Sequence, residues 1–154
     1  MEKKRLINIL ALAITFVFFA GYLSTLMAND VTLKVIKKWG KKVIIEMENE
    51  TPVLGLEFTL TDLPDVAKVK KIKTTLRTKG FLAQFNDMNE KGVKVVLVSL
   101  RGKAILPGNG PILVLSYKSN QIFGSKKADL ELRNVNIADI NNQPVKANLV
   151  GTSF

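Results

Sequence analysis

The sequence contains neither cysteine nor histidine. The absence of cysteine excludes disulfides, thiol catalysis, thiolate metal sites and acylation of a cysteine at a processing site. The absence of histidine removes imidazole as a catalytic base and as a metal ligand. The fold must therefore rest on a hydrophobic core alone, and 154 residues suit one such domain plus a targeting segment.

Aromatic side chains are also scarce, with one Trp and two Tyr in the whole chain. A sugar-binding surface usually presents a row of exposed rings that stack on pyranose faces. Trp39 lies beside Gly40, where a single ring more often covers the core, and Tyr117 alternates with Leu115 and should face inward. A polysaccharide-binding or cell-envelope structural module is therefore kept only as an alternative function.

The first 28 residues have the three parts of a secretory signal. Glu2–Arg5 form a net-positive head, Leu6–Leu23 are almost all apolar, and Ala28 offers a small residue for cleavage. The apolar run approaches the ~20 residues that span a bilayer, so an uncleaved membrane anchor is the alternative and the only membrane contact we expect. Both interpretations place residues 30–154 outside the cytoplasm, either secreted, periplasmic or on the cell surface.

The chain is basic, with a formal net charge of +10. Nucleic acid is not an expected partner because exported proteins rarely meet it; an anionic surface polymer, lipid headgroups or an acidic protein fits better. The simplest interpretation is a solvated, lysine-rich sheet face that keeps the protein soluble. The positive residues concentrate at Lys68, Lys70, Lys71, Lys73, Arg77 and Lys79.

Beyond residue 30, apolar and polar residues alternate with period two, as is typical of half-buried strands. Repeated alternation broken by turn signals predicts one all-β sandwich or barrel domain. A helix over 69–76 is disfavoured by its threonines, and two short strands are expected there. The remaining strands are expected at 31–35, 43–47, 54–60, 93–100, 112–117, 130–137 and 145–149.

Several irregular positions are also predicted from the pattern. Trp39-Gly40, Pro107–Pro111 and Asn141-Asn142 carry turn residues. The apolar register slips between Leu132 and Val135, which predicts a β-bulge.

Taken in order, these segments resemble a cohesin domain. The similarity is carried by Val53–Leu60, by Phe81–Asn86 followed by Val93–Leu100, by the glycine-rich approach Gly102–Leu113, and by Leu130–Val145. It covers Val31–Val150. The resemblance implies a nine-stranded jelly-roll β-sandwich, related in shape to several carbohydrate-binding modules. It also implies a non-catalytic module that binds a protein partner of the dockerin type, without a cofactor.

By the same resemblance, the partner would bind one flat sheet face made by the third, fifth, sixth and eighth strands. If Leu56 and Phe58 point inward, period two turns the residues between them outward. Leu82, Val96 and Val98 would then form an apolar patch among polar residues, as at the centre of an interface; the alternative is a sixth strand covered on both faces. The candidate face consists of Gly55, Glu57, Thr59, Leu82, Gln84, Asn86, Lys94, Val96 and Val98.

Metal binding and catalysis have weaker support. Asn86, Asp87, Asn89 and Glu90 could offer oxygen ligands to a cation, but such residues also dominate ordinary hairpin turns, and Asp139–Asn142 pose the same choice. Glu46 and Glu48 lie on one strand face and are better explained as partners of lysines. Ser99 and Ser116 are expected within strands and have no histidine to activate them. The sequence therefore predicts no metal site and no active site.

Overall fold

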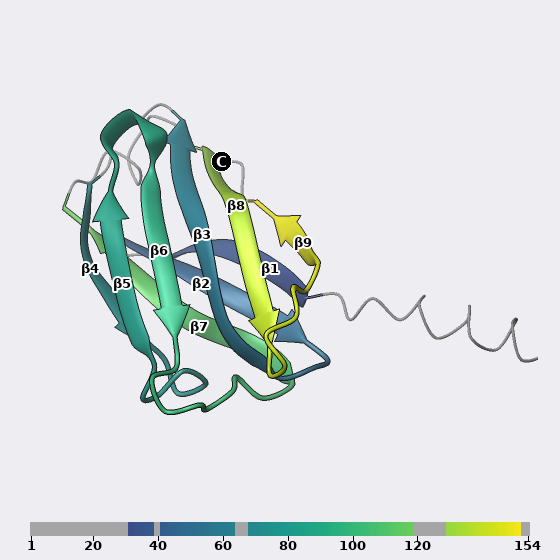
Figure 1. Ribbon diagram of the computed structural model, residues 1–154. Helices are drawn as coiled ribbons and strands as arrows, with labels where there is room; N and C mark the ends of the chain where they lie inside the picture. The colour runs from purple at the N-terminus through teal and green to yellow at the C-terminus, as the bar shows by residue number, and fades with distance from the viewer. Residues whose placement is uncertain (1–30, 39–40, 64–67, 119–128, 152–154) are drawn as a thin grey trace, which may run out of the picture.

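The structure is a computed structural model that describes residues 31–38, 41–63, 68–118 and 129–151. Within these residues nine strands and one short 3-10 turn (η1, Asn89–Lys91) form two packed sheets (Figure 1). The strands are β1 (Val31–Lys38), β2 (Lys42–Asn49), β3 (Val53–Leu63), β4 (Val69–Thr74), β5 (Leu82–Asp87), β6 (Val93–Val98), β7 (Gly108–Tyr117), β8 (Asp129–Asp139) and β9 (Ala147–Val150).

The chain passes repeatedly between the two sheets. The five-stranded sheet has the order β4-β7-β2-β1-β9, and the four-stranded sheet has the order β5-β6-β3-β8. All neighbours are antiparallel except β1 and β9, which run parallel. This is the predicted nine-stranded β-sandwich, and β6 lies inside its sheet.

The core lies between the sheets and follows the predicted alternation. Val43, Ile45 and Met47 of β2 are fully buried, and Leu56 and Phe58 of β3 face them from the other sheet with exposures of 4% and 1%. Burial of each such side chain contributes about 1.5–3 kcal/mol. This apolar layer holds the two sheets in place and fixes which residues of each strand face outward.

The bulge and the late turn are confirmed. Glu57 and Thr59 pair with Asn136 and Arg133, so β8 has one extra residue at this point, and Asn134 there has φ of 50°. In the turn after β8, the Asp139 carboxylate accepts hydrogen bonds from the backbone N–H groups of residues 141 and 143, both at 2.8 Å. The segment around residue 72 is one strand, β4, instead of two.

The predicted turn at Pro107–Pro111 is wrong. Strand β7 already begins at Gly108 and pairs with β2, where Gly110 lies opposite Met47. Gly108 and Gly110 have φ of 142° and 135°, which suit glycine and let an irregular strand continue. The glycines therefore permit a side chain from another loop to approach the backbone of this strand.

That side chain is Arg77, which sequence analysis grouped with the solvated lysines. It follows β4, and its guanidinium donates to the side-chain oxygen of Asn49 at 2.7 Å and to the carbonyls of Leu106 at 2.9 Å and Gly108 at 3.1 Å. It also donates to the carbonyls of Met47 and Gly110. Arg77 is half-buried, and burial lowers its pKa. We call this contact the Arg77 clasp, because it joins β2, β7 and the loop before β7.

Some predictions fall on parts that the structure does not describe. The signal or anchor at residues 1–28 and the turn at Trp39-Gly40 lie outside the described residues. Among the residues that are described, no helix is long and apolar enough to cross a membrane.

Candidate functional site

The nine predicted face residues all lie on the outward side of the four-stranded sheet. Strand pairing aligns them in three rows that cross β5, β6, β3 and β8 in turn (Figure 1). The rows are Leu82, Val98, Gly55 and Ala138; Gln84, Val96, Glu57 and Asn136; and Asn86, Lys94, Thr59 and Arg133.

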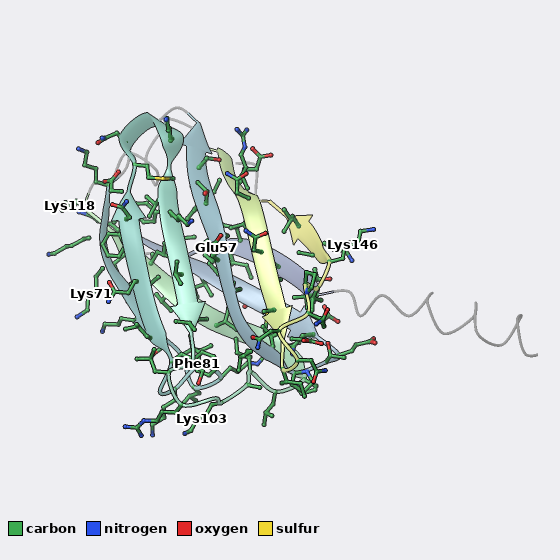
Figure 2. All side chains as sticks on the ribbon, in the orientation of Figure 1. Glu57, Lys71, Phe81, Lys103, Lys118 and Lys146 are labelled. Atoms are coloured by element: carbon green, nitrogen blue, oxygen red, sulfur yellow. The ribbon has the colours of Figure 1, made fainter. Side chains whose placement is uncertain are left out.

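Glu57 lies in the middle of this face (Figure 2) and links three strands. Its carboxylate accepts a hydrogen bond from the side-chain amide of Asn136 on β8 at 2.9 Å and forms an ion pair with Lys94 on β6 at 3.1 Å. The hydrogen bonds from Asn136 and Lys94 hold the pKa of Glu57 below its ordinary value, more than burial raises it. The centre of the face is thus polar but locally neutral.

A shallow hollow lies beside Glu57, where Gly55 contributes no side chain. Its volume is about 390 Å³, and it is mostly apolar because Val96, Val98 and Ala138 line it. A Cβ atom on Gly55 would come within 3.0 Å of the carbonyl oxygen of Leu97. Glycine therefore allows β6 to approach β3 closely and at the same time leaves the hollow open.

The predicted apolar patch borders this hollow. Leu82 is 37% exposed, and Val96 and Val98 are half-exposed, so β6 is not covered on its outer side. Thr59 departs from the expectation of an exposed residue, because it is only 5% exposed. Its pairing partners are Lys94 and Arg133, whose much longer side chains flank the short threonine.

Sequence analysis missed the β8 side of the site. Asn136 and Ala138 belong to the face, and Asn142 and Pro144 from the following turn complete the wall of the hollow. The predicted bulge was the available signal. Restarting the period-two alternation after it, with Ile137 inward, turns Asn136 and Ala138 outward.

Two of the carboxylates considered as cation ligands, Asp87 and Asp139, have roles in turns. The side chain of Asp87 accepts a hydrogen bond from the backbone N–H of Asn89 at 3.0 Å, and Asp139 holds the turn after β8. In the described part of the chain, no three acidic residues gather in a way that could hold a metal ion.

Residues considered for catalysis also have structural contacts. Glu48 pairs with Lys34 at 3.2 Å, as expected of a partner for lysine. Ser99 lies just after β6 instead of within a strand, and its hydroxyl accepts the backbone N–H of Lys103 at 2.8 Å. Tyr117 is buried as expected, with 5% exposure.

Comparison with known proteins finds matches among solved structures. No protein-family model matches the chain, and no curated protein matches it. A non-cellulosomal cohesin from the hyperthermophilic archaeon Archaeoglobus fulgidus is similar in structure with a TM-score of 0.65 and 19% identity, over 81% of this chain and 89% of that one.

Two further solved structures show the same likeness. A cohesin in a type I cohesin–dockerin complex from Clostridium thermocellum has a TM-score of 0.59 and 16% identity, over 79% of this chain and 88% of that one. The sixth cohesin of Acetivibrio cellulolyticus scaffoldin B, in complex with a dockerin, has a TM-score of 0.61 and 12% identity, over 82% and 97%. The described residues of this chain therefore form a cohesin-like β-sandwich.

Proposed function

We propose that this protein is an exported, non-catalytic binding module that holds a protein partner on the outer face of the four-stranded sheet. The observation that carries the proposal is the hollow at Gly55, open to solvent and lined by Val96, Val98 and Ala138. An apolar side chain of a partner can enter this hollow, and burial of apolar surface at an interface centre is what drives association.

The polar residues around the hollow suit a protein partner. Gln84, Asn86 and Asn136 present exposed amides, which can pair with backbone or side-chain groups at an interface rim. Because Glu57 and Lys94 already neutralise each other, a partner can cover them without burying an unpaired charge. A dockerin-type partner is supported by two of the similar cohesins, whose structures contain bound dockerins.

Export is part of the proposal and rests on the sequence of residues 1–28, with its positive head and apolar run. N-terminal sequencing of the mature protein tests cleavage after Ala28. A chain that begins at Met1 and stays in the membrane fraction indicates the anchor instead, and one that begins at Met1 in the cytoplasm contradicts export.

Binding is tested by capture from culture supernatant of the source organism on the immobilised protein, with identification of what is retained. Val96→Asp/Val98→Asp places two charges at the hollow and should abolish capture, about a hundred-fold loss or more from desolvation of the added carboxylates. The matched control is Ile44→Asp/Val114→Asp, two half-buried residues paired on the outer face of the other sheet, which should still capture the partner.

Circular dichroism must show both variants folded. Equal capture by both variants excludes the proposed face. Retention of the wild-type protein on insoluble glycan, without any captured protein, supports the polysaccharide alternative. Among the described residues of that sheet, Phe58 is buried and Phe85 packs against the core, so they give its outer face no ring platform.

A further inference from the structure

Three leucines project from loops at one end of the sandwich. Leu76, between β4 and β5, is 92% exposed, and Leu100 and Leu106, between β6 and β7, are 74% and 70% exposed. The Arg77 clasp joins the two loops through the carbonyl of Leu106 at 2.9 Å. Several large apolar side chains exposed to water at one end of a domain are costly, and such surfaces are often covered by a partner or a membrane.

The charged residues of the same two loops are all positive. Lys79, Arg101 and Lys103 are exposed, and Arg77 is engaged in the clasp, while 75–81 and 99–107 contain no carboxylate. The labelled Lys103 and Phe81 lie together at this end in Figure 2. The neighbouring end of β2 and the turn after it carry two exposed acids, Glu50 and Glu48, of which Glu48 pairs with Lys34. Exposed leucines and exposed cations on the same two loops match an anionic lipid surface, which offers an apolar interior beneath negative headgroups.

The start of β1 gives a second reason. Thr32, Glu48 and Asn109 lie in one row of the five-stranded sheet, so β1 begins at the end where β7 begins. The two strands are separated only by β2, which places their starts about 10 Å apart. The apolar run Leu6–Leu23 precedes β1 in the sequence and Leu106 precedes β7. The chain thus enters β1 at the end of the five-stranded sheet that is also next to Leu106.

We propose that this loop end docks on an anionic bilayer, with Leu76, Leu100 and Leu106 entering the headgroup region and Lys79, Arg101 and Lys103 contacting lipid phosphates. The four-stranded face then stays clear of the membrane and available to a partner. The inference does not depend on what that face binds. The apolar run supports docking where residues 1–28 are retained, and the leucines and cations carry the inference in either case.

The lack of cysteine makes a site-specific test direct, because any introduced thiol is the only one in the chain. Leu76→Cys and Leu106→Cys in the full chain are labelled with an environment-sensitive fluorophore. The matched control is Lys118→Cys, an exposed site just past the other end of β7 and about 30 Å from Leu106. Each is mixed with vesicles of phosphatidylcholine, alone or with phosphatidylglycerol.

With phosphatidylglycerol present, the labels at 76 and 106 should shift to shorter wavelength and lose quenching by iodide, while the label at 118 changes in neither respect. The ratio of docked to undocked label should fall about five-fold for each of Lys79→Gln, Arg101→Gln and Lys103→Gln. These variants lie on exposed loop positions and leave the clasp intact.

Labels at 76 and 106 that remain quenched on both vesicles overturn the proposal, and so does an equal response at 118. A response that is the same without phosphatidylglycerol excludes recognition of anionic lipid. Protection of the two labels by soluble polyglutamate, but by neither vesicle, assigns this end to an acidic protein instead. Capture of a partner on the four-stranded face is a separate measurement. None of the vesicle results therefore decides whether the proposed function is right.

Discussion

The outer faces of the two sheets both carry apolar residues, yet only the four-stranded face combines them with small neighbours. On the five-stranded face Ile44 and Val114 are paired in a row whose neighbouring rows contain Lys42, Lys71 and other lysines. Long lysine side chains can lie along apolar surface with their charge in water. On the four-stranded face Val98 lies between Leu82 and Gly55, and Ala138 follows Gly55 in the same row, so on the β3 and β8 side no long side chain covers Val98. The size of the adjacent side chains therefore decides which apolar residues a partner can reach.

The charges differ in the same way. Glu57 and Lys94 pair at the centre of the four-stranded face, and Glu131 pairs with Arg133 beside them at 2.7 Å. On the five-stranded face the described ion pair is Lys34 with Glu48, at one end. One face is close to neutral and the other positive, which favours a protein interface on the first and solvation of the second.

The Arg77 clasp is less exposed to water than the ion pairs on the two sheet faces. Its removal should therefore have the largest effect on stability. Arg77→Ala removes the guanidinium that donates to the side-chain oxygen of the buried Asn49 and to four carbonyls, and we expect the unfolding free energy to fall by about 3 kcal/mol. Arg77→Lys should lose most of the same amount, because an ammonium cannot reach this set of acceptors. Urea unfolding measures both.

Lys79→Ala is the control for Arg77, two residues along and exposed, and should change stability by less than about 0.5 kcal/mol. If Arg77→Ala is as stable as this control, the clasp does not hold the start of β7, and the glycine-rich strand there must be stable through pairing with β2 alone.

A larger side chain at Gly55 tests whether a partner uses the hollow on the four-stranded face. Gly55→Val places a Cβ atom against the Leu97 carbonyl and forces β6 away from β3, at a cost of about 1–3 kcal/mol. It should also prevent capture of the partner, because the hollow is then occupied. Thermal unfolding measures the loss of stability, and the capture assay measures the loss of binding.

The control is Ser116→Val, which introduces the same side chain at a half-exposed position of β7, also one strand from a sheet edge. It should cost less than about 0.5 kcal/mol and leave capture unchanged. Unchanged capture by a folded Gly55→Val protein would show that a partner does not enter the hollow.

The sequence predicted most of this architecture because period two reports burial directly. Val43, Ile45 and Met47 are inward and buried, and the slip between Leu132 and Val135 indicated a real bulge. Turn composition was less reliable at Pro107–Pro111, because glycine permits an extended strand as well as a turn.

Only part of the candidate site was predicted from the sequence. Alternation gives the side of a residue but not the size of what stands beside it, so Thr59 was expected to be exposed and is covered. The Arg77 clasp could not be predicted, because its acceptors are mostly backbone carbonyls of other strands and any sequence offers those.

The smallest effect is expected at Glu57 and depends on pH. Because its pKa in the folded protein lies below the ordinary value of 4.5, its contacts stabilise the fold above that pH, and the contribution is lost as pH falls through the lower folded value. The carboxylate is 34% exposed, which limits the contribution to a few tenths of a kcal/mol.

Glu57→Gln should therefore be slightly less stable than the wild type at neutral pH, and the difference should shrink as pH falls below 4.5. Urea unfolding at several pH values measures it. A difference that grows in acid would mean that burial in the sheet outweighs the hydrogen bonds from Asn136 and Lys94. Glu57 would then be a strained, unfavourably charged group, and the four-stranded face would not be the neutral surface that distinguishes it from the other sheet.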